Sequence, residues 1–505
     1  MSLINVSNLT FSYEGSYDDI FTDVSFQIDT AWKLGFCGRN GRGKTTFLKL
    51  LMGEFEYRGS ISSSVKFDYF PFPVVDKTLD TMSILTTIAP ETPAWQIQKE
   101  ISLLDITEDA LYRPFQTLSN GEQTKSLLAG LFLRGENFLL IDEPTNHLDM
   151  SGRETVADYL NRKSGFIVVS HDRSFLDTCV DHILSINKAN IEVIKGNFST
   201  WIENKERQDN FELAENEKLK KDVKRLQLAA KQSEDWSSKA ESAKMGKGAA
   251  KARKKGNDGI DMMAYNAEKS RRMQQRRKNL ERRQQSAIED KSKLLKNLET
   301  ADDLKIFPLT YHTSRLITVE GLEVTYDNNN HSDCKKIIND LSFSLMQGDR
   351  IALRGSNGSG KSSLLKLICG EDIPHTGLIT IGSKLVISYV PQDTSFLAGD
   401  LKSHTEKYQI DETLFKSILR KLDFSRIQFG KDMRDFSAGQ KKKVLLATSL
   451  CQQAHAYIWD EPLNYIDVLS RIQIEDLILK YQPTLLFVEH DRTFCEKIAT
   501  ITINL

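Results

Sequence analysis

The sequence predicts an α/β fold in which two similar domains are joined in tandem by a long helical hairpin. Three observations lead to this expectation. Motifs in the first 200 residues recur in the same order near the end of the chain, at an offset close to 317 residues. In each copy an apolar stretch runs into a glycine-rich loop and then into an apolar helical segment. The intervening segment is rich in Lys, Glu, Arg, Gln and Ala and has no proline until Pro308, which favours long helices.

Length and composition narrow the class of protein. A chain of 505 residues is too long for one hydrophobic core. Its 40% hydrophobic and 27% charged residues are typical of a globular protein. No apolar run reaches the roughly 20 residues of a membrane helix, and the first residues, MSLINVSNLTFSY, lack the layout of a signal peptide. We therefore expect a cytoplasmic protein with no membrane partner, and the absence of CxxC spacing favours reduced cysteines.

The internal repeat defines the domains. Because a duplicated domain explains matched motifs at a constant offset, we expect domains at 1–200 and 311–505, with a linker at 201–310. Four pairs of segments carry the repeat: LINVSNLTFSY (3–13) and LITVEGLEVTY (316–326), GRNGRGKTT (38–46) and GSNGSGKSS (355–363), LSNGEQ (118–123) and FSAGQ (436–440), LLIDEPTNHLD (139–149) and YIWDEPLNYID (457–467).

The linker shows the spacing of a coiled coil interrupted by a loop. Two sets of apolar residues recur at intervals of three, four or seven, which indicates helices that pack along a seam. Four glycines in MGKGAAKARKKGNDG (245–259) disfavour helix between them, so we expect a basic tip loop at about 244–262. The seam residues are Leu219, Val223, Leu226 and Ala230, then Met273, Leu280, Ala287 and Leu294.

Both glycine-rich loops have the GxxxxGK[ST] pattern of a phosphate-binding loop in the required context between a strand and a helix. Glycines let backbone N–H groups converge on phosphates, and the helix N-terminus adds positive charge. We expect Lys44 and Lys361 to reach the outer phosphates, and Thr45 and Ser362 to offer hydroxyls to magnesium. The nucleotide-binding residues expected in the loops are Gly38, Arg39, Asn40, Gly41, Arg42, Gly43, Lys44, Thr45 and Thr46, and Gly355, Ser356, Asn357, Gly358, Ser359, Gly360, Lys361, Ser362 and Ser363.

Adjacent acids end a second apolar strand in each copy: Asp142 with Glu143, and Asp460 with Glu461. We interpret the first carboxylate of each pair as a magnesium ligand and the second as the general base that orients the attacking water. A solvated acidic pair is the alternative.

Two histidines and two tyrosines also occupy matched positions. His171 and His490 each follow an apolar strand, 29 residues beyond Asp142 and 30 beyond Asp460. We interpret these histidines as sensors of the terminal phosphate, although a single histidine there is more often structural. Tyr13 and Tyr326 precede the phosphate loops and could stack on adenine or belong to the core.

Charge is segregated along the chain. Residues 241–283 contain 14 basic and 5 acidic residues, a net charge of +9, whereas the whole chain totals −1. A long positive hairpin on an acidic body fits insertion into a polyanion such as ribosomal RNA or tRNA, and a solvated basic face is the alternative. The RNA-binding residues expected at the tip are Lys244, Lys247, Lys251, Arg253, Lys254 and Lys255.

Over both repeats the sequence resembles the ATP-binding-cassette (ABC) family, because five motifs appear in family order. They are Walker A (38–46 and 355–363), the signature (118–123 and 436–440), Walker B (139–143 and 457–461), the D-loop in EPTNHLD and EPLNYID, and the H-switch at His171 and His490. The resemblance implies two cassettes paired head to tail around two ATP molecules with Mg²⁺. It implies that Ser437 and Gly439 complete the first site, and Ser119 and Gly121 the second.

One position departs from the family pattern. Gln392 is the expected Q-loop glutamine and metal contact in the second copy, but its counterpart in the first copy is Phe72. Phenylalanine cannot coordinate magnesium or water, so we expect the two sites to turn over unequally.

Two cassettes joined by a charged hairpin resemble the ABC-F group. The extended tip and YFPF (69–72) resemble antibiotic-resistance ribosome protection proteins of the Lsa, Vga and Vml types, especially Lsa. This implies a monomer with intramolecular cassette pairing that enters the exit (E) site of the 70S ribosome. Its hairpin would reach rRNA and P-site tRNA near the peptidyl-transferase centre and displace lincosamides, pleuromutilins or streptogramin A. A housekeeping ABC-F translation factor, an exporter ATPase subunit and a coiled-coil DNA-repair cassette are the alternatives, although we expect no DNA partner.

Overall fold

The computed structural model describes residues 2–13, 19–135, 137–146, 148–186, 191–208, 304–326 and 335–505, with some single residues between 210 and 225. The chain divides into one compact unit, Met1–Trp201 with Ala301–Leu505, and a second unit, Ile202–Thr300. In the second unit, residues 202–208 are helical. The expected coiled-coil seams, the tip loop at 244–262 and its RNA-binding residues lie outside the described residues.

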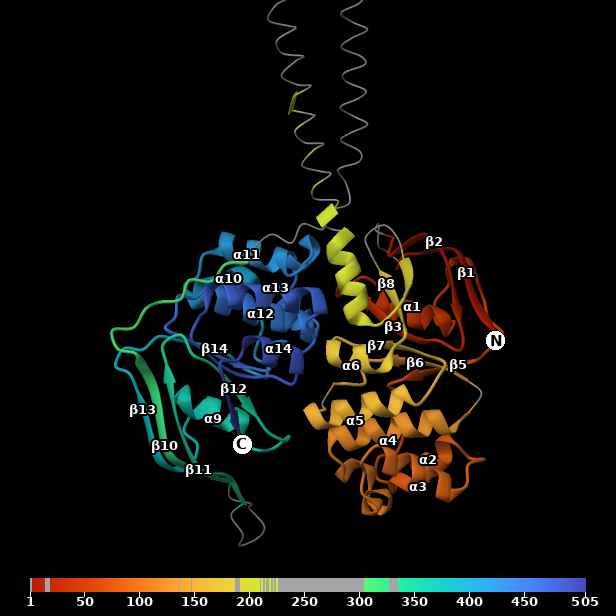
Figure 1. The fold of residues 1–505 in the computed structure, drawn as a ribbon, viewed down its shortest axis with the longest axis horizontal. Coiled ribbons are helices and arrows are strands. Elements are labelled where there is room, and N and C mark those ends of the chain that lie inside the picture. The colour runs from red at the N-terminus through yellow and green to blue at the C-terminus, as the bar shows by residue number, and fades with distance from the viewer. Residues whose placement is uncertain are drawn as a thin grey trace, which may run out of the picture. The chain divides into compact units, whose positions relative to one another are not determined.

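The first cassette contains a small antiparallel sheet and a larger, mainly parallel sheet (Figure 1). In the larger sheet β8 (His182–Ile186) and β9 (Ile191–Lys195) pair antiparallel, and the other neighbours pair parallel. In spatial order the small sheet is β2 (Phe21–Asp29), β1 (Leu3–Phe11) and β4 (Arg58–Ser62). The larger sheet is β5 (Phe67–Phe70), β6 (Phe138–Asp142), β7 (Phe166–Val169), β3 (Lys33–Gly38), β8 (His182–Ile186) and β9 (Ile191–Lys195).

Helix α1 (Lys44–Leu51) anchors the first phosphate loop in the core. Its Phe47 and Leu48 are fully buried in one cluster with Leu9 of β1 and Phe36 of β3. Because both sheets contribute to this cluster, the loop before α1 has a fixed base. The other helices are α2 (Thr81–Ile88), α3 (Ala94–Leu103), α4 (Asn120–Leu133), α5 (Met150–Asn161) and α6 (Arg173–Cys179), with 3₁₀ turns at Glu108–Tyr112 and Phe115–Thr117.

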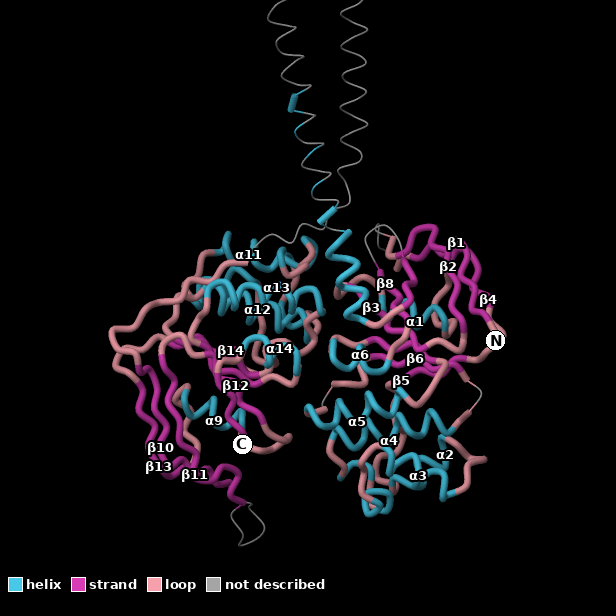
Figure 2. Tube along the Cα trace, viewed as in Figure 1, coloured by secondary structure: helices cyan, strands magenta, loops and turns pink. Residues whose placement is uncertain are grey.

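The second cassette repeats this plan, as the alternation of strands and helices in Figure 2 shows. The predicted α/β fold with two tandem nucleotide-binding domains is confirmed. Its small sheet is β11 (Lys335–Met346), β10 (Arg315–Tyr326) and β13 (His375–Ile381), and its parallel sheet is β14 (Ile387–Val390), β15 (Ala456–Asp460), β16 (Leu485–Val488), β12 (Arg350–Arg354) and β17 (Ile501–Asn504). Its helices are α9 (Lys361–Ile368), α10 (Leu401–Tyr408), α11 (Glu412–Lys421), α12 (Ala438–Cys451), α13 (Val468–Tyr481) and α14 (Arg492–Ile498), with 3₁₀ turns at Arg426–Gly430 and Met433–Asp435.

The parallel strands place the predicted site residues at one edge of each sheet. β7 and β16 are buried at every position, as expected of strands covered on both faces. In the first cassette β6, β7 and β3 are parallel neighbours, so their carboxyl ends meet. The acids after β6, the histidine after β7 and the loop after β3 therefore share one edge, where α/β sheets bind ligands.

None of the helices in the described part of the chain is long and apolar enough to cross a membrane. Five cysteines lie in that part, and all five are free thiols, in agreement with the sequence-based expectation. Cys334 lies outside it.

Candidate nucleotide-binding sites

Each phosphate loop turns into its helix at a glycine in the left-handed backbone region. Gly43 has φ 89° and caps α1, and Gly360 has φ 93° and caps α9. A Cβ at Gly43 would lie 2.5 Å from Ile20 Cγ2, and one at Gly360 would lie 2.7 Å from Ile337 Cγ2. Only glycine combines this φ with so little space, so each loop can aim its backbone N–H groups at one point.

The lysine of each loop lies inside that loop. Lys44 Nζ donates to the carbonyl oxygens of Gly38 (2.7 Å) and Arg39 (3.2 Å), and Lys361 Nζ donates to those of Gly355 (2.9 Å) and Ser356 (2.8 Å). Burial lowers the pKa of both lysines. Each ammonium group thus occupies the centre of a loop whose amides suit phosphate oxygens.

The first carboxylate of the acidic pair is anchored in the first cassette. Asp142 Oδ2 accepts hydrogen bonds from Thr45 Oγ1 (2.7 Å) and from Tyr69 on β5 (3.0 Å). The Thr45 contact joins two residues that were expected to hold magnesium together. The sequence alone does not predict this role of Tyr69, because only the pairing of β5 with β6 shows that it faces Asp142.

In the second cassette the corresponding oxygens have no such anchors. Both carboxylate oxygens of Asp460 are buried without a hydrogen-bond partner among the described residues, as is the hydroxyl of Tyr389. Burial raises the pKa of Asp460 to about 6, and the nearby Ser362 hydroxyl opposes part of this shift. Buried oxygens without partners fit a hydrated Mg²⁺ ion. Ser362, Asp460 and Gln392 would hold it here, as Thr45 and Asp142 would in the first cassette, and bound Mg²⁺ would neutralise phosphate charge.

Both candidate general bases adopt an uncommon backbone conformation. Glu143 has φ 52° and Glu461 has φ 47°, which is the left-handed region. Such non-glycine residues cost about 1–3 kcal/mol each and cluster at functional sites. The Nε2 atoms of His171 and His490 each lie 3.4 Å from Oε1 of the glutamate in the same cassette. The same strained geometry thus pairs a carboxylate with a histidine in both copies.

The two glutamates nevertheless differ in their hydrogen bonds. Glu461 Oε2 accepts from Gln392 Nε2 (2.9 Å) and Asn464 Nδ2 (2.5 Å). Burial opposes its ionisation, but His490 and Gln392 outweigh this effect and lower its pKa. In the first cassette Phe72 stands where Gln392 stands in the second. Burial and the neighbouring Asp142 raise the pKa of Glu143 to about 8, so Glu461 is the better proton acceptor near neutral pH.

The first pocket combines the first phosphate loop with the signature segment of the second cassette. It has a volume of about 400 Å³. Its first-cassette walls are Asn40, Gly41, Lys44, Thr45, Asp142, Glu143, Val169 and His171. Its second-cassette walls are Asp423, Phe424, Gln428, Ser437, Ala438, Gly439, Gln440, Lys443 and Tyr465.

The second pocket has the reciprocal composition and a volume of about 860 Å³. Among its walls are Ser356, Asn357, Gly358, Gly360, Lys361, Ser362, Ser363, Gln392, Glu461 and His490 of the second cassette. The first cassette contributes Ser119, Asn120, Gly121, Glu122, Lys125, Asn146, Asp149 and Arg153 among others. In both pockets a serine–glycine turn therefore faces a phosphate loop that lies more than 230 residues away in the sequence.

The signature serines also cap helices. Ser119 and Ser437 each form a capping box with the residue three positions later, at the start of α4 and α12. Each of these two serines therefore caps a helix and also lines a pocket. Gly439 is required at its position, because a Cβ there would lie 2.8 Å from the carbonyl oxygen of Tyr465.

Some predicted residues do not line these two pockets. Tyr13 is 44% exposed, and its hydroxyl lies 2.8 Å from Thr46 Oγ1 on α1. The side chain of Tyr326 lies outside the described part of the structure. The others outside the pocket walls are Gly38, Arg39, Arg42, Gly43, Thr46, Gly355, Ser359 and Asp460.

Several pocket residues were not predicted, and Tyr465 is the clearest case. It lines both pockets, and its carbonyl oxygen accepts a 2.7 Å hydrogen bond from Asn40 Nδ2 across the cassettes. The EPLNYID segment that contains it departs from the first-copy sequence EPTNHLD, and this difference was the only available signal.

The sequence profile of the family described as "ABC transporter" matches residues 21–146 and 338–464, half of the chain. The chain belongs to this family. This ABC protein is 27% identical to the ribosome protection protein VmlR of Bacillus subtilis over 98% of this chain and 85% of that protein. It is 25% identical to the energy-dependent translational throttle protein EttA of Haemophilus influenzae over 95% of this chain and 88% of that protein.

A third relative is the ABC transporter F family member 2 of Arabidopsis thaliana, 24% identical over 99% of this chain and 76% of that protein. Full-length similarity to such proteins supports membership of the ABC-F group. Among solved structures, an archaeal ribosome recycling factor, aABCE1, in complex with the stalk protein aP1 matches with a TM-score of 0.61 at 18% identity. The match covers 98% of this chain and 87% of that chain, and it shows the shared fold.

Proposed function

We propose that this ABC-F protein hydrolyses ATP in two composite sites and uses the cycle to act on the ribosome. One observation carries the enzymatic part: each pocket joins the phosphate loop, the glutamate of the acidic pair and the histidine of one cassette to the serine–glycine turn of the other. Such a site is complete only when the cassettes are closed, so nucleotide binding and closure are coupled.

In the proposed reaction Lys361 and the loop amides hold the phosphates at the second site. Gln392 and Asn464 orient the Glu461 carboxylate, which accepts the proton of the attacking water. His490 lies 3.4 Å from Glu461 and contacts the terminal phosphate. Lys44, Glu143 and His171 take the same roles at the first site.

The ribosome is the proposed partner for two reasons. The relatives include a ribosome protection protein and a translational throttle protein. The linker carries a charge of +9 between residues 241 and 283, which suits contacts with RNA phosphates. In the proposed cycle the ATP-bound monomer enters the E site of the 70S ribosome, and the linker reaches rRNA and P-site tRNA near the peptidyl-transferase centre.

We further propose the ribosome protection role, with displacement of lincosamides, pleuromutilins or streptogramin A and a cytoplasmic location. Similarity to VmlR over 98% of the chain supports it. A housekeeping translation factor is the second candidate, supported by the similarity to EttA. Deletion of the gene separates the two: increased drug sensitivity supports protection, whereas slow growth with unchanged sensitivity supports the housekeeping role.

Ribosome co-sedimentation tests the partner directly. A Glu143→Gln, Glu461→Gln variant should bind ATP, remain closed and pellet with 70S ribosomes. The matched control is Lys44→Ala, Lys361→Ala, which should remain in the supernatant because it cannot retain the phosphates. Equal pelleting of both variants, or pelleting with neither ribosome nor ATP dependence, would refute the proposal.

A further inference from the structure

We propose that the two cassettes stay joined on the side of the first pocket and separate on the side of the second pocket during the ATP cycle. The inference goes beyond the proposed function, because it concerns which contacts between the cassettes persist and does not depend on the ribosome. The contacts between the cassettes on the first side differ from those at the repeat-related positions on the second side.

A buried ion pair joins the cassettes beside the first pocket. Arg173, two residues after His171, pairs with Glu475 of α13, with Nη1 3.2 Å from Oε2. Glu475 is fully buried and also accepts from Lys497 Nζ (3.1 Å), and Asp491 lies 3.7 Å from Arg173. Separating the cassettes here would break the contacts of Arg173 with Glu475 and Asp491, while Glu475 would keep its contact with Lys497.

The corresponding contact on the other side is exposed. The repeat aligns His171 with His490, so Arg492 corresponds to Arg173. Arg492 Nη1 lies 3.1 Å from Glu154 Oε1 of α5, and both side chains are more than half exposed. Ion pairs between such exposed groups contribute little to stability.

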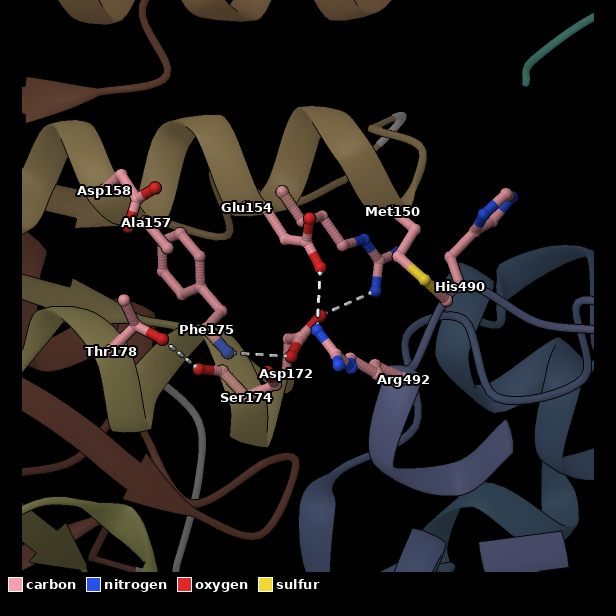
Figure 3. A pocket seen from close by; sticks show the side chains of 11 residues that line it. Met150, Glu154, Ala157, Asp158, Asp172, Ser174, Phe175, Thr178, His490 and Arg492 are labelled. Carbon is pink, nitrogen blue, oxygen red and sulfur yellow. Dashed lines mark hydrogen bonds and ion pairs between the residues drawn. The ribbon is translucent and has the colours of Figure 1, made fainter. Parts of the chain in front are cut away.

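A pocket occupies the place of the missing charges. Counted from Asp149 and Asp467, Ala157 stands where the second cassette has Glu475. Counted from His171 and His490, Thr178 stands where it has Lys497. Figure 3 shows Ala157, Thr178 and Arg492 around a pocket of about 260 Å³, in which Glu154 pairs with Arg492. Asp172 pairs with Arg153, which also lines this pocket. The second side therefore has a pocket at the positions where the first side has Glu475 and Lys497.

The phosphate loops also make more charged contacts between the cassettes on the first side than on the second. Arg39 and Arg42 of the first loop lie 3.9 Å and 4.0 Å from Asp423 Oδ1 in the second cassette. The second loop has Ser356 and Ser359 at these positions. Asp105 corresponds to Asp423, and both adopt a left-handed conformation, with φ 56° and 61°. Serines cannot form the ion pairs that arginines form, so this second cross-cassette attachment is confined to the first side.

These differences indicate that the first side is the joint, meaning the side on which the cassettes stay in contact. Opening there breaks the Arg173–Glu475 pair and two contacts to Asp423, whereas opening at the second side breaks the exposed Arg492–Glu154 pair. The larger volume of the second pocket, about 860 Å³ against 400 Å³, agrees with this order. Nucleotide should therefore exchange at the second site while the first site keeps its nucleotide.

Distance measurements between attached labels test the proposal in the full-length chain. Repeat-related exposed positions provide a matched set: labels at Glu54 and Arg420 report on the first side, and labels at Glu371 and Ser102 report on the second. ATP removal should lengthen the second distance and leave the first unchanged. Equal lengthening of both distances, or lengthening of the first alone, would overturn the proposal.

Substitutions that give one side the residues of the other side do not remove a charge from the buried Arg173–Glu475 pair, and so are less prone to unfold the protein. Ala157→Glu with Thr178→Lys supplies the missing charges in the 260 Å³ pocket and should slow release of a fluorescent ATP analogue from the second site about tenfold, the effect of one charged hydrogen bond. Ala157→Gln with Thr178→Met fills the space without charge and should have a smaller effect.

Arg39→Ser with Arg42→Ser gives the first loop the serines of the second. This variant should allow the Glu54–Arg420 distance to lengthen when ATP is removed. If the first side stays closed in this variant and the Ala157→Glu, Thr178→Lys variant releases nucleotide as fast as wild type, these contacts are not the joint.

Discussion

Asn40 Nδ2 in the first cassette donates a 2.7 Å hydrogen bond to the carbonyl oxygen of Tyr465 in the second. The other end of the same amide, Oδ1, lies 3.0 Å from Nε2 of His171. One side chain in the phosphate loop thus contacts the histidine of its own cassette and the D-loop of the other. This arrangement links the state of the first site to closure.

Replacing Asn40 with alanine should weaken closure without removing the phosphate loop. One net hydrogen bond is worth about 0.5–1.5 kcal/mol, so the ATP concentration that half-saturates ribosome association should rise about 2- to 10-fold. Titration of co-sedimentation with ATP measures this value. An unchanged midpoint would show that the Tyr465 contact does not contribute to closure.

The two general bases should contribute unequally to ATP turnover. His490 and Gln392 outweigh the effect of burial and lower the pKa of Glu461, whereas burial raises the pKa of Glu143 to about 8. Loss of a general base slows a site about 10²- to 10⁴-fold. Glu461→Gln should therefore remove most of the steady-state ATPase rate, and Glu143→Gln less than half. Equal losses and equal residual rates in the two variants would contradict the expected inequality.

The Q-loop position is the simplest cause of that inequality. Phe72→Gln should provide an amide donor for Glu143 and increase turnover at the first site, measured in a Glu461→Gln background. The reciprocal change, Gln392→Phe in a Glu143→Gln background, should reduce turnover at the second site by removing the 2.9 Å hydrogen bond to Glu461. No response to either exchange would place the cause elsewhere.

The basic tip should be needed for protection but not for catalysis. Replacing residues 246–256 with a short turn should abolish drug protection and spare ATPase activity, because both nucleotide pockets lie in the cassettes. A Gly/Ser segment of equal length separates reach from charge by removing Lys247, Lys251, Arg253, Lys254 and Lys255. Growth in drug and phosphate release are the measurements, and retained protection with the short turn would refute the role of the tip.

Acid should destabilise the second cassette through His404. Burial lowers the pKa of His404 to about 4, and its Nε2 lies 2.9 Å from Thr448 Oγ1. Because the unfolded chain binds this proton more tightly than the folded chain, the contribution of His404 to stability is present above pH 6.5 and is lost as the pH falls toward 4. A His404→Gln variant should show a flatter melting temperature across that range. A parallel decline in both proteins would assign the acid sensitivity to other groups.

The tandem fold could be predicted because its signals are local. GRNGRGKTT and GSNGSGKSS each fix a strand, a turn and a helix within about ten residues, and apolar runs before Asp142 and Asp460 read as buried strands. The composite sites could be expected only from the family resemblance, because Ser437 and Asn40 are 397 residues apart. Nothing in the spacing of either segment indicates the other.

The contacts that distinguish the two sides could not be predicted. The roles of Tyr69, Tyr465 and Asp423 depend on which side chains strand pairing and cassette pairing bring together. The φ values of Glu143 and Glu461 likewise result from the turn after the strand rather than from residue preference, since glutamate rarely adopts them.

Because each pocket takes its serine–glycine turn from the opposite half, a half expressed alone would have no complete site. Two identical halves associating freely would produce two identical sites, each with arginines facing Asp105 or serines facing Asp423. Covalent fusion of the halves prevents this. It fixes one copy of each half per molecule, and so permits a division of labour that a symmetric homodimer cannot have.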